Sequence, residues 1–124
     1  MPCDRAKRER AHPAPTKLRT VEATESPVLI DVWTVDASRE PALIERISEI
    51  TRDLLAGHEG FVSAQIYESD DLGAVMIRVT MRTFKDLQAL TDSAEVHGAL
   101  RELRLIAESH AHFFRLVESF GEAA

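Results

Sequence analysis

The order of strand-like and helix-like segments along this chain constrains its fold more than any other feature. Four runs rich in β-branched and aromatic residues are typical of strands: 28–35, 61–67, 74–81 and 110–117. Between the first two runs, apolar residues recur at the spacing of one helical face: Leu43, Ile47, Ile50 and Leu54. A second helical pattern fills 84–107. The order strand, helix, strand, strand, helix, strand predicts an α+β, ferredoxin-like split βαβ fold, with helices on one face of a four-stranded antiparallel sheet.

Capping signals predict where the helices begin and end. Ser38 is the expected N-cap of the first helix, and Gly57 with Gly60 is expected to end it and form the turn. Residues 83–86 (Thr-Phe-Lys-Asp) resemble a capping box that opens the second helix. Residues 92–95 (Asp-Ser-Ala-Glu) repeat the signal, so we expect the second helix to stop and restart there.

Length and charge narrow the class of protein. The chain has 124 residues and one cysteine, Cys3, which predicts one domain with no internal disulfide and no cysteine metal cluster. No apolar run is long enough to span a membrane, and 1–25 lacks the apolar segment of a secretory signal. We therefore expect a cytoplasmic protein that does not contact a membrane.

The N-terminal residues differ in character from the rest. Residues 1–26 are rich in Pro, Ala and Arg without a hydrophobic period, so we expect a disordered tail, with a functional basic arm as the alternative, before a domain at 27–121. Residues 1–25 hold six basic and four acidic residues and so have a net charge of +2. Because the whole chain has a net charge of -6, residues 26–124 carry -8. An acidic domain repels phosphate backbones, which argues against a nucleic-acid partner.

The first predicted strand is apolar on both faces. Its side chains alternate between two sets: Leu29, Asp31, Trp33 and Val35 on one face, and Val28, Ile30, Val32 and Thr34 on the other. Two helices can cover only one face, and leaving the other in water would forfeit several kcal/mol, at about 25 cal/mol per Å². We therefore expect a homodimer that packs sheet against sheet. The alternative is that strand curvature and the tail cover the second face.

Three segments carry a resemblance to a known family. They are Gly60-Phe61-Val62 at the start of the second strand, Tyr67-Glu68-Ser69-Asp70-Asp71 at the hairpin, and Thr91-Asp92-Ser93-Ala94-Glu95-Val96-His97 at the helix restart. From Pro27 to Phe120 the chain resembles the antibiotic biosynthesis monooxygenase family of the dimeric α/β-barrel superfamily. Met81 departs from this pattern, since many members have a tryptophan there. Asp31, Leu90 and Leu100 stand where the haem-degrading branch has Asn, Trp and His, which argues against haem cleavage.

The resemblance implies an activity. The quinone-forming branch of the family uses no metal, flavin or haem, and oxidises an anthrone or similar phenolic polycycle with O2. We therefore expect a cofactor-independent monooxygenase of aromatic polyketide-like substrates. A polyketide cyclase or aromatase of the same fold and a non-catalytic metabolite-binding dimer are the alternatives. The leading function predicts a dry, apolar pocket of roughly several hundred Å³ between sheet and helices.

Three residues are candidate catalytic groups. Asp31 lies mid-strand between apolar neighbours, where desolvation would raise its pKa as a general base requires. An ion pair with Arg78, or an edge position near water, is the alternative. His97, at the edge of the apolar stripe of the restarted helix, is a candidate base or oxyanion donor, with a surface histidine as the alternative. His112 on the last strand is a candidate for the pocket or the dimer interface.

The predicted substrate-binding residues are Trp33, Tyr67, Arg78 and Met81. Trp33 would stack on a flat ring, with core packing as the alternative. Tyr67 would donate a hydrogen bond to a substrate oxygen, or else cap the core at a strand end. His110 and His112 lack a third ligand at fixed spacing, so no metal site is expected. Arg104 is expected on a solvated helix face.

Overall fold

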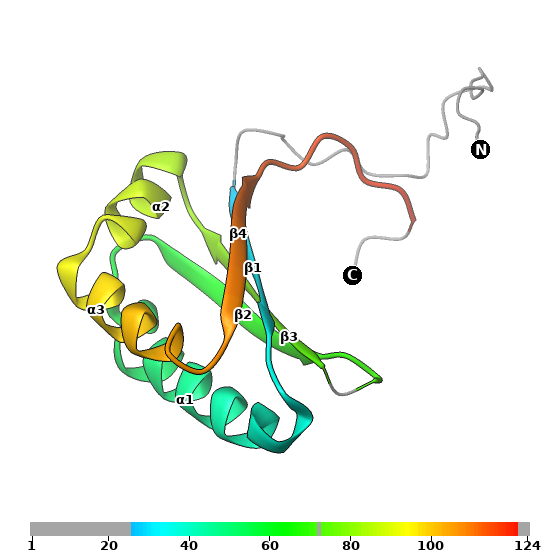
Figure 1. Ribbon diagram of the computed structural model, residues 1–124. Coiled ribbons are helices and arrows are strands. Elements are labelled where there is room, and N and C mark those ends of the chain that lie inside the picture. Colours follow the sequence, from blue (N-terminus) through cyan, green and yellow to red (C-terminus); the bar gives the residue numbers. More distant parts are fainter. Residues whose placement is uncertain (1–25, 72, 122–124) are drawn as a thin grey trace.

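The computed structural model describes residues 26–71 and 73–121. The helices and strands run in the order β1 (Val28–Thr34), α1 (Glu40–Asp53), β2 (Phe61–Glu68), β3 (Ala74–Met81), α2 (Phe84–Thr91), α3 (Ala94–Leu103) and β4 (Glu108–Phe114). The strands form one antiparallel sheet in the order β2-β3-β1-β4, and the helices lie together on one side of it (Figure 1). The predicted ferredoxin-like α+β fold is confirmed. The tail predicted at 1–26 lies outside the described residues except for Ser26.

The two helices of the second half begin where their capping signals predict. The Thr83 hydroxyl accepts a hydrogen bond from the Asp86 amide at 3.0 Å, and the Ser93 hydroxyl accepts one from the Val96 amide at 3.4 Å. These caps satisfy amides at the starts of α2 and α3 that have no partner within the helix. The predicted interruption of the second helix is therefore confirmed.

Two predicted boundaries are wrong. Ser38 lies in a short 3-10 turn (Ala37–Arg39), and α1 begins at Glu40 after Arg39, whose side chain makes no capping bond. The last strand was expected at 110–117 but spans Glu108–Phe114. It ends there because β4 pairs only with β1, and Phe114 lies opposite Val28, the first residue of that strand. Residues after Phe114 have no neighbouring strand to pair with.

β1 is a central strand and determines what each face of the sheet carries. Leu29, Trp33 and Val35 face the helices, and the buried side chains of β3 lie beside them: Val75, Ile77, Val79 and Met81. Helix side chains such as Leu43 and Leu87 complete this core. The predicted alternation of the first strand is therefore confirmed.

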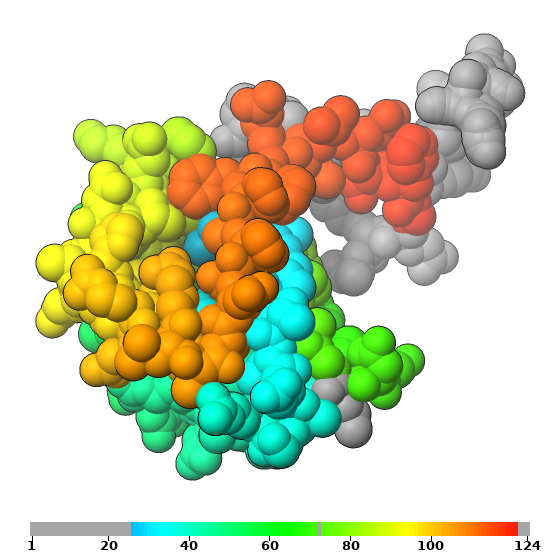
Figure 2. Space-filling view, viewed as in Figure 1, coloured from blue at the N-terminus to red at the C-terminus, as the bar shows by residue number. Residues whose placement is uncertain are grey.

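The opposite face of the sheet, which we call the open face, has no helix against it (Figure 1). Val32, Tyr67 and Phe114 lie on it and expose 36%, 46% and 48% of their surface. Near one end of β1, residues 115–117 line a groove with Val28 and Ile30. In the space-filling view, β4 and the segment after it are uncovered along one edge of the sheet (Figure 2). The homodimer stays a prediction.

Within the described residues, no helix is both long enough and apolar enough to cross a bilayer.

Candidate functional site

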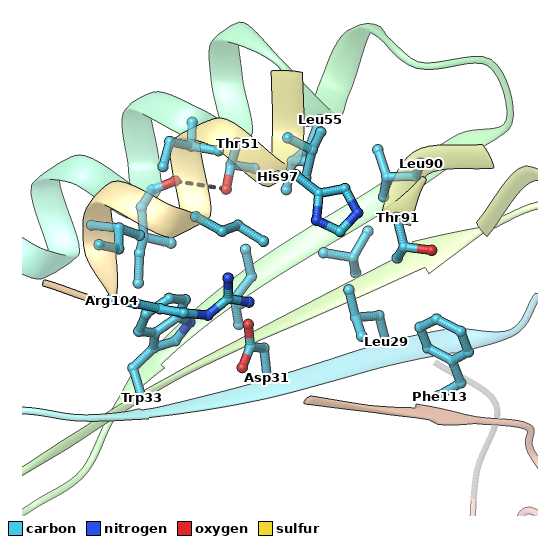
Figure 3. Close-up of a pocket in the computed structure, with 17 residues that line it drawn as sticks. Leu29, Asp31, Trp33, Thr51, Leu55, Leu90, Thr91, His97, Arg104 and Phe113 are labelled. Carbon is cyan, nitrogen blue, oxygen red and sulfur yellow. Dashed lines mark hydrogen bonds between the residues drawn. The ribbon is translucent and has the colours of Figure 1, made fainter. Parts of the chain in front are cut away.

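An apolar cavity of about 190 Å³ lies between the sheet and the three helices. β1 and β3 form its floor through Leu29, Trp33 and Val79, and helix side chains such as Ile47 and Leu90 cover it. Figure 3 shows these walls enclosing a few polar groups. The pocket is where the sequence placed it but smaller than the several hundred Å³ expected.

Asp31 is the buried polar group on the cavity floor. It sits in the middle of β1, opposite Ile77 on one side and Ala111 on the other, and exposes 4% of its surface. Its Oδ1 atom is buried and has no hydrogen-bond partner. Burial raises the pKa of Asp31, and the positive charge of Arg104, hydrogen bonding by Trp33 and the charge of His110 lower it by less.

The alternative in which Arg78 pairs with Asp31 is wrong. Arg78 lies opposite Ile30 across the β1–β3 pair, and Ile30 points to the open face. Because side chains alternate along a strand, Arg78 and Asp31 are on opposite sides of the sheet. The basic group that faces Asp31 is instead Arg104, at the C-terminal end of α3 (Figure 3).

His97 and Arg104 enter the cavity from the same side of α3. Both line the cavity, and the guanidinium of Arg104 points toward the carboxylate of Asp31 while the His97 ring points into the space beside it (Figure 3). Arg104 is exposed to solvent, as expected, but its side chain also lines the cavity. A signal for it was present, because residues seven apart lie on one helical face two turns from each other.

Thr51, Thr91 and Phe113 also line the cavity and were not predicted from the sequence. The hydroxyls of Thr51 and Thr91 donate hydrogen bonds to carbonyls of their own helices, at 2.8 and 3.1 Å. Their protons are already used in these bonds, and the ionisable groups that line the cavity are Asp31, His97 and Arg104. No signal for Phe113 exists in a local pattern, since it depends on the pairing of β4 with β1.

The predicted site residues fall into two groups. The cavity brings together Asp31, His97 and Trp33, and Trp33 is both a wall of the cavity and a core residue with 1% exposure. It does not bring in Met81, which is buried opposite Phe61, nor three residues of the open face: Tyr67, Arg78 and His112. Within one protomer these three cannot reach a ligand in the cavity.

A metal ion finds no ready site in the described residues. They contain no group of three or more His, Cys, Asp or Glu side chains arranged to hold one. The acid–base and ionic groups of the cavity, one carboxylate, one imidazole and one guanidinium, are suited to moving a proton and binding an anion.

Comparisons with known proteins find relatives by structure. No protein-family model matches the chain, and no curated protein matches its sequence. A conserved protein of unknown function from Bacteroides thetaiotaomicron, described as a possible oxidoreductase, has a TM-score of 0.66 and 22% identity, over 76% of this chain and 100% of that one. SnoaB, a cofactor-independent oxygenase from Streptomyces nogalater, has a TM-score of 0.64 and 13% identity, over 79% and 99%.

A third similar structure is assigned to the family that this sequence resembles. A protein of Deinococcus radiodurans, provisionally assigned as an antibiotic biosynthesis monooxygenase, has a TM-score of 0.69 and 11% identity, over 79% of this chain and 99% of that one. Identities this low establish the fold alone. The chain therefore has the ferredoxin-like fold of antibiotic biosynthesis monooxygenases.

Proposed function

We propose that this protein is a cofactor-independent monooxygenase that oxidises an electron-rich, aromatic polyketide-like phenol with O2. The observation that carries the proposal is the buried carboxylate of Asp31, whose Oδ1 is unpartnered on the floor of an apolar cavity. A carboxylate that is kept from water is a stronger base than one in solution. The similar fold of SnoaB, a cofactor-independent oxygenase, supports the same chemistry.

The proposed reaction begins with a proton transfer. Asp31 removes a proton from an acidic C–H or O–H of the bound ring, and the resulting anion passes one electron to O2. The two radicals combine into a carbon-bound peroxide, which takes a proton to become a hydroperoxide. Loss of water from it leaves a carbonyl where a CH2 group stood. One oxygen atom enters the product and the other leaves in water, with both hydrogens and all four electrons supplied by the substrate.

The size of the cavity limits how the substrate sits. A cavity of about 150 Å³ lined by aliphatic and aromatic side chains holds a benzene molecule. The 190 Å³ here therefore suits one substituted ring. We propose that the ring with the acidic proton enters the cavity, and that further rings of a polycycle remain at its mouth beside His97 and Arg104. Both of these residues are exposed to solvent.

Oxygen uptake with an anthrone tests this function. The wild-type protein, freed of metals by a chelator, should consume one O2 per substrate and yield a quinone that carries one atom of labelled oxygen from ¹⁸O2. Asp31→Asn should lower turnover by about 100-fold or more, since general-base catalysis contributes about 10²–10⁴. The exposed Asp36→Asn is the matched control. Equal turnover of Asp31→Asn and wild type would remove Asp31 from the mechanism.

The same experiment separates the alternatives. A cyclase or aromatase would release water from a polyketide substrate without consuming oxygen. A metabolite-binding protein would bind the ring and return it unchanged.

We also propose that the protein is a cytoplasmic homodimer joined through the open face. The exposed apolar surface of Val32 and Tyr67 supports this, because a second copy would remove it from water. Arg78 and His112 would then be interface residues. Sedimentation should show a dimer, and Val32→Asp should shift it to the monomer. The control is Leu105→Asp, at an apolar residue 82% exposed that lies beyond the sheet. A wild-type protein that sediments as a 13.9 kDa monomer would exclude the dimer.

A further inference from the structure

The position of Arg104 gives its side chain a defined place at the cavity. It is the C-cap residue of α3, and its backbone amide donates a hydrogen bond to the Leu100 carbonyl at 3.1 Å. The main chain is thus held by the helix end, while the side chain extends over the cavity toward Asp31 (Figure 3). A substitution at this position changes the side chain without removing the backbone bond.

Arg104 and Asp31 face each other without a direct ion pair. Within the described residues no salt bridge joins the two side chains, and Oδ1 of Asp31 makes no hydrogen bond. The charge of Arg104 nevertheless reaches Asp31 and acts on its ionisation. Because both groups line the same cavity and point toward each other (Figure 3), a ligand atom between them can contact both.

Other groups around Asp31 do not supply a second full positive charge inside the cavity. Trp33 on β1 is uncharged, and Thr51 on α1 and Thr91 on α2 donate to their own helices. His97 of α3 shares the cavity with Arg104. His110 of β4 acts on Asp31 from the open face of the sheet, since it lies opposite Val32. Arg104 is therefore the permanent cation available to a ligand there.

We propose that Arg104 determines substrate specificity: its guanidinium binds the oxygen anion of a phenol whose proton Asp31 has taken. The proposal rests on the proposed function and adds the residue that selects an ionisable phenol over a neutral ring of the same shape. Moving the proton from the phenol to Asp31 moves one negative charge to the substrate. The cavity holds one negative and one positive charge before and after the transfer. No charge is left unbalanced in an apolar space, where it would be costly.

This arrangement predicts opposite effects for the two residues on the binding of a phenolate. Removing the Asp31 charge removes the negative group that competes with the ligand for Arg104, so phenolate binding should become stronger. Removing the Arg104 charge leaves the phenolate beside a carboxylate and should weaken it. If Arg104 only balanced the charge of Asp31 structurally, its loss would leave the affinity for a phenolate unchanged relative to a neutral ligand of the same shape.

Binding of 4-nitrophenol tests the proposal independently of turnover. The compound is electron-poor and is not expected to react with O2, and its phenolate has a visible absorption band that reports binding. 4-Nitroanisole has the same ring and no ionisable proton, so it measures whether the cavity is intact. Titrations use the full-length wild type, Arg104→Gln, Asp31→Asn, the double variant, and Arg101→Gln, which removes an exposed arginine of α3 outside the cavity.

Above the pKa of the probe, Asp31→Asn should bind the phenolate about tenfold or more tightly than wild type, as expected for a hydrogen bond to a charged group. The double variant should lose that gain, and Arg101→Gln should match wild type. All variants should bind 4-nitroanisole within about twofold of each other.

Equal phenolate affinity in Asp31→Asn and the double variant, with 4-nitroanisole binding intact, would overturn the proposal. If Arg104→Gln does not bind 4-nitroanisole, Arg104→Lys, which keeps the charge, is used in its place. A phenolate selectivity of Arg104→Lys within about twofold of the wild-type value would support a role for the positive charge itself. Oxygen uptake without phenolate selectivity would refute this inference alone. Selectivity without oxygen uptake would refute the proposed function alone.

Discussion

Replacing Asp31 by asparagine should make the protein more stable at neutral pH, even though the same change should lower turnover. The carboxyl lies in the central strand with 4% exposure, and Oδ1 lacks a partner. An ionised group in that position is destabilised by its loss of hydration, and Arg104 offsets part of this. Asparagine has nearly the same shape and no charge, so the substitution removes the penalty while leaving the packing in place.

The sign of the pH dependence follows from proton binding. The pKa of Asp31 is raised in the native state above the value of 3.8 of an unperturbed side chain. Between those two values the folded protein binds more protons than the unfolded chain, so the free energy of unfolding of the wild type falls as pH rises through this window. It stays lower above the window. Below it the carboxyl is protonated in both states, and the difference from asparagine disappears.

The expected size is about 1 kcal/mol at about pH 8, the lower part of the range for a buried, unpartnered polar group, because Arg104 compensates in part. In a domain of about 100 ordered residues this raises Tm by about 4–8 °C.

Urea unfolding at fixed protein concentration, from about pH 4 to about pH 8, measures the effect, with exposed Asp36→Asn as a control that should stay within about 0.5 kcal/mol of wild type. A variant less stable than wild type at high pH, or a difference that does not change with pH, would contradict the assignment of Asp31 as a desolvated base.

Three further changes test how the fold supports the site. Leu87→Ala, at a fully buried residue of α2, should lower the free energy of unfolding by about 2–5 kcal/mol in the same urea assay. Ser93→Ala removes the cap on the Val96 amide and should reduce stability by about 0.5–2 kcal/mol, seen as a lower thermal midpoint; an unchanged midpoint would mean that water replaces the cap. Gly60→Ala should destabilise by about 1 kcal/mol or more, because Gly60 has φ of +85° and a Cβ there would collide with the Asp86 side chain; equal stability would show that the turn can relax.

Most of the fold could be predicted from the sequence because its signals are local. The β-branched and aromatic run at 28–35 and the helical spacing from Leu43 to Leu54 each lie within one segment, and Thr83 and Ser93 act on amides three residues away. The end of β4 could not be predicted, since it depends on where β1 stops pairing. When a neighbouring strand determines where a strand ends, the sequence of that strand alone does not indicate its boundary.

The candidate site was predictable where one strand or helix presents it. Alternation in β1 places Asp31 and Trp33 on one face, and helical spacing places His97 near the cavity. The partner of Asp31 was not predictable, because Arg78 and Arg104 are both plausible until the faces of the sheet are known. Register decides between them: Arg78 lies opposite Ile30, whose side chain points away from the cavity.

The alternation of β1 also separates the two proposed functions of the sheet. Asp31 and Trp33 point into the cavity, and the neighbouring Val32 points to the open face where a second copy would pack. Because successive side chains leave the strand on opposite sides, the pocket and the interface share a backbone but no side chain. A central strand bonded on both edges is held in register by β3 and β4 and is hard to displace. A dimer formed on the open face would therefore fix the floor of the cavity, and with it the position of the Asp31 carboxylate, without supplying any group that contacts the ligand.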